Sequence, residues 1–222
     1  MLQQATLKFL TDLKKNNNKP WMDAHRSRYE AAKADFGQFV EQVLKGLSKK
    51  DPSVAHLAAK DCTFRINRDI RFSKNKVPYK TNMGAFINKG GKKAPMAGYY
   101  LHLEPGGSFM GGGLYMPMPD VLKKVRQEID YNLDDFKKII SAKKFKSVYG
   151  DLSRDAEYSL SRVPKGYEPD NPAAEYLKLK SFVATVELKD REVISASFLK
   201  QALTAFAALQ PVIAFLNQAT ED

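Results

Sequence analysis

Residues 99–115 read YYLHLEPGGSFMGGGLY, and this stretch decides the fold class. Apolar and polar side chains alternate from Tyr99 to Glu104, which is typical of a strand with one buried face. Pro105-Gly106-Gly107-Ser108 predicts a tight turn, and Phe109 to Tyr115 predicts a second strand. Because so short a connection joins antiparallel neighbours, the stretch predicts a β-hairpin. The glycines at 111–113 have no side chains, which indicates a bulge or the close approach of another backbone or a ligand.

Further strands and helices are predicted on both sides of this hairpin. Alternating runs favour strands at 62–66, 84–88, 159–163 and 182–188. Apolar residues at helical spacing predict helices at 2–15, at 21–49 with a break near Gly37, and at 117–129, 133–141, 171–177 and 191–218. Pro211 is expected to kink or divide the last helix, because proline removes a helical hydrogen bond.

The order of these elements predicts an α+β fold. Helices flank a meander of short strands, so we expect a single domain over residues 1–222, with an antiparallel central sheet packed by the N- and C-terminal helices. A chain of 222 residues, 43% of them hydrophobic and 11% aromatic, has enough apolar side chains to bury a full core.

Composition also bears on location and partners. Cys62 is the single cysteine, which excludes an intramolecular disulfide and fits a reducing compartment. No stretch reaches the roughly 18 uninterrupted apolar residues of a membrane span. The N-terminal sequence MLQQATLKFL lacks the basic start and cleavage site of an export signal. We therefore expect a cytoplasmic protein that does not bind membranes.

The positive charge of the chain is concentrated in one segment. Residues 64–82 read FRINRDIRFSKNKVPYKTN, and they carry six cationic side chains against the single acid Asp69. Extending the segment to Lys93 gives nine cations and one acid, a net +8 out of +11 for the whole chain. Because the positive charge is concentrated in this one segment, it indicates a site that binds an anion.

We interpret this segment as an ordered loop that forms an anion-binding pocket for a phosphate- or carboxylate-bearing small molecule. Arginine forks bind such groups in a bidentate manner, and lysine adds a mobile charge. The predicted anion-binding residues are Arg65, Arg68, Arg71, Lys74, Lys76, Tyr79 and Lys80. Asp69 is expected to orient an arginine. The other expected supporting residues are Asn67, Thr81, Asn82, Tyr100 and Tyr115.

Two other interpretations use the same residues. Nucleic acid or an acidic protein could bind the basic surface, with aromatic rings stacking on bases. No reader module is recognisable, however, and Phe64 and Phe72 are expected to pack in the core. In the purely structural alternative, the arginines form ion pairs with acids of the same chain, such as Glu104 or Asp120.

Candidate catalytic residues are few. His102 and Glu104 lie two residues apart on one face of a predicted strand, where either could move a proton in a reaction on the bound anion. The three histidines are far apart in sequence, so neither a metal site nor a cofactor is predicted. Cys62 is expected to be a buried, inert thiol. The glycines at 111–113 are not followed by the Gly-Lys-Ser/Thr of a nucleotide-binding loop.

Several of these runs occur together in a known family. They are Phe9-Leu10, Leu13, Asn16-Asn17, Trp21, Tyr29, the whole segment from Phe64 to Asn82, Tyr99 to Leu103, Gly111 to Gly113 with Tyr115 and Pro117, and Pro164 to Tyr167. On these residues the chain resembles the bacterial family called domain of unknown function 2461. The resemblance covers nearly the whole chain and implies a single domain, but no particular reaction, substrate or cofactor. Met22 departs from the pattern, which has a second aromatic residue after Trp21; we expect a substitution in the core.

Overall fold

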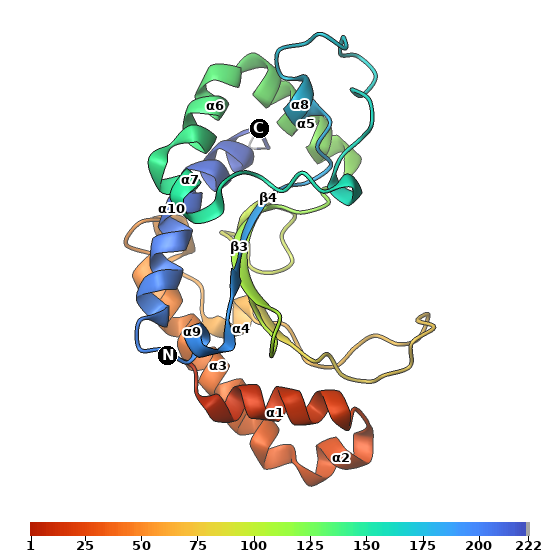
Figure 1. The fold of residues 1–222 in the computed structure, drawn as a ribbon, viewed down its shortest axis with the longest axis vertical. Helices are drawn as coiled ribbons and strands as arrows, with labels where there is room; N and C mark the ends of the chain where they lie inside the picture. The colour runs from red at the N-terminus through yellow and green to blue at the C-terminus, as the bar shows by residue number, and fades with distance from the viewer. Residues whose placement is uncertain (221–222) are drawn as a thin grey trace. The chain divides into compact units, whose positions relative to one another are not determined.

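The predicted hairpin lies at the centre of the fold. In a computed structural model that describes residues 1–220, β2 (Gly98–Leu103) and β3 (Ser108–Leu114) are the inner strands of a four-stranded antiparallel sheet. The edge strands are β1 (Met83–Ile87) and β4 (Phe182–Leu188), and the order is β1-β2-β3-β4 (Figure 1). The predicted α+β class is confirmed.

The helices of the described residues lie before, between and after the strands. They are α1 (Gln4–Lys15), α2 (Lys19–Ala24), α3 (Arg26–Leu47), α4 (Ala59–Cys62), α5 (Pro119–Tyr131), α6 (Leu133–Ser141), α7 (Lys143–Tyr149), α8 (Ala174–Leu177), α9 (Asp190–Val193) and α10 (Phe198–Gln218), with short 3₁₀ turns at Pro52–Val54 and Ala156–Tyr158. Most predicted helices are confirmed to within a few residues, and α6 coincides with its predicted range. The helix predicted at 21–49 is divided at His25, and the one predicted at 191–218 is divided at residues 194–197.

Some predictions of local structure were wrong. The strand predicted at 62–66 is the end of α4 followed by irregular backbone, in which Thr63 forms a single bridge to Ala85. This helical turn is stabilised by a distant side chain, because a carboxylate oxygen of Glu41 accepts a hydrogen bond from the backbone N–H of Ala59 at 2.6 Å. The strand predicted at 159–163 is likewise reduced to one bridge, between Ser159 and Leu179.

Two helices are more continuous than expected. No break occurs near Gly37, because α3 runs unbroken from Arg26 to Leu47 and buries an apolar stripe on either side of that glycine. Pro211 lies within α10 and does not divide it. By length and composition alone, α10 could cross a membrane, and half of its apolar window is buried inside the fold.

The backbone contacts divide the chain into two compact units. The first comprises Met1–Lys92, Tyr100–Met110 and Glu187–Thr204. Its core includes a stacked pair, Phe39 on α3 and Phe198 at the start of α10, with ring centroids 4.7 Å apart. The second unit comprises Lys93–Tyr99, Gly111–Val186 and the described chain from Ala205 onward. In its core the rings of Tyr99 and Phe206 lie 5.3 Å apart.

The glycine run in β3 allows a neighbouring backbone to approach closely, as its sequence indicated. A Cβ atom on Gly111 would lie 2.1 Å from the carbonyl oxygen of Ala184, and one on Gly113 would lie 2.0 Å from that of Phe182. Both acceptors belong to β4. Gly113 also has a φ of +119°, which side chains disfavour. The run is therefore a requirement of the contact between β3 and β4.

We expect Gly113→Ala to destabilise the fold by about 2–4 kcal/mol, because the new methyl group would collide with backbone that cannot move aside. Gly37→Ala is the matched control, since a Cβ there has no heavy atom within 4 Å. It should stabilise α3 by about 0.5–1 kcal/mol. Thermal unfolding followed by circular dichroism measures both effects, and a Gly113→Ala protein as stable as the wild type would contradict the close contact.

Candidate functional site

A chain of hydrogen bonds joins three polar side chains of β2. Because alternate residues of a strand point to the same side, Tyr100, His102 and the following Glu104 line one face. His102 Nε2 lies 3.2 Å from Glu104 Oε2, and His102 Nδ1 lies 3.2 Å from the hydroxyl oxygen of Tyr100. The amide nitrogen of Asn82, just before β1, lies 3.3 Å from the same Nδ1. These side chains are partly buried.

The partners of His102 define the roles of its two nitrogens. The side-chain NH₂ of Asn82 can only donate, so Nδ1 is the acceptor, and its single lone pair is shared between this NH₂ and the Tyr100 hydroxyl. Nε2 then carries the proton and donates to Glu104. Burial raises the pKa of Tyr100, which keeps its phenol protonated and able to donate. The arrangement of carboxylate, imidazole and hydroxyl is that of a proton relay.

Neighbouring rings and a glycine hold the relay in place. The ring of Phe109 on β3 stacks on the imidazole of His102, with centroids 4.6 Å apart and an interplanar angle of 14°. Gly84 on β1 makes room for the Tyr100 hydroxyl, because a Cβ at this glycine would lie 2.9 Å from the hydroxyl oxygen. Thr81 donates a hydrogen bond to Glu104 Oε1 at 2.9 Å.

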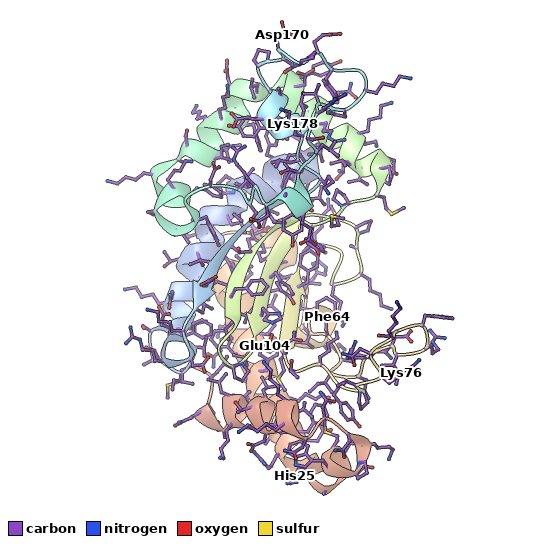
Figure 2. All side chains as sticks on the ribbon, turned by 45° about the vertical axis from the view of Figure 1, so that its right-hand side comes forward. His25, Phe64, Lys76, Glu104, Asp170 and Lys178 are labelled. Carbon is purple, nitrogen blue, oxygen red and sulfur yellow. The ribbon has the colours of Figure 1, made fainter. Side chains whose placement is uncertain are left out.

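The basic segment forms a two-stranded ribbon that projects from the strands of its unit (Figure 1). Residues 66–68 pair with residues 78–80: Arg68 N–H donates to the Pro78 carbonyl at 2.9 Å, and Lys80 N–H donates to the Ile66 carbonyl at 2.8 Å. The loop at 69–77 closes the far end. Figure 2 shows Phe64 at the base of this ribbon and Lys76 on its loop, with Glu104 on the strands beside it.

One side chain anchors the ribbon to the N-terminal helices. Asn17, which follows α1, accepts a hydrogen bond from the Tyr79 N–H at 3.1 Å and donates one to the Tyr79 carbonyl at 3.0 Å. Its amide thus pairs both backbone groups of Tyr79, as an adjacent strand would. The Tyr79 side chain itself is buried.

A hollow of about 410 Å³ lies between this anchor, the ribbon and the start of β1. Its lining contains three cations and no acid: Lys14, Asn17, Arg68, Asn75, Val77, Tyr79, Lys80, Thr81 and Asn82. Three of these residues also contact the relay. Besides the bonds from Thr81 and Asn82, the ammonium of Lys14 lies 3.9 Å from Glu104 Oε1. The hollow and the relay therefore form one continuous polar site.

Lys80 is the electrostatically strained member of the hollow. Burial lowers the pKa of its ammonium, and repulsion by Arg65 lowers it further. The ammonium lies 5.4 Å from the ring centroid of Phe64, which partly compensates its charge. No carboxylate in the described part of the hollow neutralises it. The negative charge of an anion beside Lys80 would offset both effects, because an opposite charge favours the ammonium form.

The structure brings together some of the predicted anion-binding residues and separates others. Arg68, Tyr79 and Lys80 line the hollow with Thr81 and Asn82. The other predicted cations, Arg65, Arg71, Lys74 and Lys76, lie outside its lining.

Two of the outlying cations are engaged within the loop. Arg71 makes a bidentate ion pair with Asp69, at 3.0 and 2.7 Å. The ammonium of Lys76 donates to the carbonyl oxygen of Ile70 at 3.0 Å. Asp69 therefore orients an arginine, as expected, and holds it away from the hollow.

Two predicted supporting residues have other roles. Asn67 contributes backbone pairing, through its bridge to Tyr79. Tyr115 belongs to the second unit, where its ring lies 5.8 Å from that of Tyr158. Sequence reasoning missed Lys14 and Asn17, because nothing in the pattern of α1 indicates a contact with a segment more than 60 residues later in the chain.

A larger groove, of about 930 Å³, lies in the second unit between α6, α7 and α10. Its floor is formed by apolar residues that include Ala208, Pro211 and Phe215. No chain of hydrogen bonds among its described lining residues joins three titratable side chains as in the group of Tyr100, His102 and Glu104, so the smaller hollow is the candidate site. Within residues 1–220, no group of three or more His, Cys, Asp or Glu side chains could hold a metal ion.

We expect Asn17→Ala to loosen the ribbon and cost about 1–3 kcal/mol, because both backbone groups of the half-buried Tyr79 segment would lose their partner. Asn16→Ala is the matched control, since the Asn16 side chain is exposed and bonds only within its own helix, to the Asp12 carbonyl. Hydrogen exchange at the Tyr79 amide should accelerate in the first variant and stay unchanged in the second. Equal exchange in both would contradict the anchoring role.

The comparisons with known proteins settle the family. The chain belongs to the conserved hypothetical protein family DUF2461, whose model matches residues 5–215, and the resemblance noted in the sequence is confirmed. No curated protein and no solved structure matches the chain.

Proposed function

We propose that this DUF2461 protein binds a phosphate- or carboxylate-bearing small molecule in the basic hollow and exchanges a proton with it through the Tyr100–His102–Glu104 relay. One observation carries the proposal. The described lining of the hollow has Lys14, Arg68 and Lys80, and its one neighbouring carboxylate, Glu104, lies 3.9 Å from Lys14 alone among these cations. Thr81 and Asn82 connect the hollow directly to Glu104 and His102. Three convergent cations with neutral hydrogen-bonding groups are the chemistry that recognises a compact anion.

The donors of the hollow suit an anion of the size of a phosphate or carboxylate. Arg68 donates through Nη1 to the Val77 carbonyl at 3.0 Å, which fixes the guanidinium plane and leaves its other N–H groups for a ligand. Lys14, which comes from α1 and not from the ribbon, has its ammonium 3.9 Å from Glu104 Oε1. Both cations are therefore positioned before a ligand arrives, which lowers the entropic cost of binding.

The relay supplies the acid–base step. A proton leaving the bound molecule would pass to Nδ1 of His102, and the resulting imidazolium would keep its Nε2–H bond to Glu104, which stabilises the new charge. The Asn82 amide and the Tyr100 hydroxyl occupy Nδ1 at 3.3 and 3.2 Å, so the ligand must displace both before its proton can reach the lone pair of this nitrogen. In the reverse direction His102 returns the proton from Nδ1. The step needs no metal or redox partner, because only a proton moves.

The purely structural alternative, in which the arginines form ion pairs within the chain, describes Arg71 but not Arg68. Arg71 has its own carboxylate in Asp69. Arg68 bonds to a carbonyl oxygen, and the described lining around Arg68 and Lys80 has no acid. Their positive charge therefore favours a ligand.

We expect Lys80→Met to weaken the binding of inorganic sulfate by about tenfold, because one of three charges close to the anion is lost. The matched control is Lys74→Met, which removes the same charge from the ribbon at a site outside the hollow. It should change the affinity by less than about twofold, through screened long-range attraction alone. Isothermal titration calorimetry measures both variants. Equal losses would indicate diffuse attraction to the ribbon and contradict a site in the hollow.

The pH dependence of sulfate binding provides a second test. The anion needs charged Lys80, so affinity should fall as pH rises through the lowered pKa of this residue. Arg65→Gln removes a repulsive charge and raises the pKa of Lys80, which should move this fall in affinity to higher pH. Titrations between about pH 7 and about pH 11 compare the two proteins. A midpoint that does not move, or that moves to lower pH, would contradict the coupling between Arg65 and Lys80.

A further inference from the structure

The outer surface of the ribbon differs from the sequence prediction in one important respect. Phe64 and Phe72 were expected in the core, but the structure leaves their side chains 40% and 95% exposed. An almost fully exposed phenylalanine stabilises nothing in its own fold, because it buries no apolar surface. Its position at the end of a projecting basic loop makes it available to a partner.

From this arrangement we infer that the ribbon binds single-stranded nucleic acid, with bases stacking on Phe72 and Phe64 and the surrounding cations contacting the phosphates. This function lies beyond the small-molecule site, since Phe72, Arg71 and Lys74 do not line the hollow. Aromatic rings between cations along a basic strip are the general means of binding single strands without sequence preference.

Each exposed ring has a cation beside it. The guanidinium of Arg71 lies 5.9 Å from the ring centroid of Phe72, and the ammonium of Lys80 lies 5.4 Å from that of Phe64. A base that stacks on Phe64 therefore brings its phosphate close to Lys80. At Phe72 the positive charge comes from Lys74, two residues further along the loop, because Asp69 already pairs with Arg71. Figure 2 shows Phe64 at the base of the ribbon, whereas Arg71 and Phe72 belong to the loop at 69–77 that closes its far end.

The loop that carries Phe72 is held by bonds within itself. Asp69 accepts two bonds from the Arg71 guanidinium, Lys76 donates to the Ile70 carbonyl, and the Val77 N–H donates to the Asn75 side chain at 2.9 Å. Because these bonds already order the loop, it loses less conformational entropy on binding a ligand than a flexible loop would. Asp69 is the single acid between residues 64 and 82, and its charge is already matched by Arg71.

The distribution of rings favours nucleic acid over a lipid bilayer. Insertion into a membrane needs apolar side chains grouped on one face. Here a single ring occupies the end of the loop, flanked by Arg71 and Lys74, and the second ring lies at the other end of the ribbon. Alternation of charge and ring along a strip suits a polyanion whose phosphates and bases alternate in the same way.

The test is fluorescence anisotropy with a labelled oligothymidylate of about 12 nucleotides. Phe72→Ala should weaken binding by about five- to one-hundredfold, the loss of stacking for one base, and leave the salt slope unchanged because no charge is lost. Lys74→Met should reduce the slope of log affinity against log salt by about 0.7, the contribution of one phosphate contact. Tyr131→Ala is the matched control: Tyr131 is a 73% exposed aromatic residue on α5, and its loss should have no effect.

Three results would overturn the inference: no binding of the oligonucleotide at low salt, wild-type binding by Phe72→Ala, or an equal loss in Tyr131→Ala. Co-sedimentation with phosphatidylserine-containing vesicles that is lost in Phe72→Ala, without oligonucleotide binding, would assign the loop to membranes instead. Sulfate titration of Phe72→Ala keeps the two proposals apart. Phe72→Ala should bind sulfate with wild-type affinity, since this residue does not line the hollow. If the wild-type protein fails to bind sulfate, that result contradicts the small-molecule site but not the nucleic-acid site.

Discussion

The site depends on the two hydrogen bonds between the side chain of Asn17 and the backbone of Tyr79. A long ribbon of charged residues has little apolar surface to bury, so its own pairing does not determine where it lies. The side-chain amide of Asn17 fixes the position of the ribbon, because it pairs with the backbone N–H and carbonyl of Tyr79 as a neighbouring strand would. It brings the returning half of the ribbon, with Lys80 and Thr81, next to the end of α1, where Lys14 lies. The hollow exists because these two segments are held together.

The electrostatics of the site follow from which acids are present and where. Glu104 lies beside the hollow, and its two oxygens are shared among Thr81, His102 and Lys14. Glu104 therefore accepts the hydrogen bond from His102 and only partly neutralises Lys14. Asp69, the one acid of the ribbon, is taken up by Arg71 at the far end. Arg68 and Lys80 thus have no carboxylate in the described lining of the hollow, and burial makes the charge of Lys80 costly.

Local patterns were enough to predict most of the fold. The alternation in β2 predicted the hairpin, because pairing of neighbouring strands follows from local sequence. The glycines of β3 indicated a bulge or the close approach of a backbone or ligand, and the structure identifies the neighbour as β4. The same alternation placed His102 and Glu104 on one face. Long-range contacts were beyond this reasoning. Glu41 accepts a hydrogen bond from the Ala59 N–H and so stabilises the helical turn at 59–62, just before the residues predicted as a strand. Asn17 binds the backbone of Tyr79 and so brings the end of α1 to the site. Charge alone also could not distinguish Arg68, which lines the hollow, from Arg71, which is paired.

The exposure of Phe72 changes how the basic segment should be interpreted. Hydrophobicity predicts burial, but a core position needs a neighbouring surface, and the ribbon projects beyond the strands of its unit. With Asp69 holding Arg71 beside that ring, the outer end is built as an ordered combination of aromatic surface and charge, whereas the inner end combines cations with hydrogen-bonding groups. The first combination suits a stacked base, and the second suits a compact anion. In our two proposals the basic segment therefore uses separate surfaces, because Asp69 holds Arg71 at the outer end and Asn17 anchors the inner end.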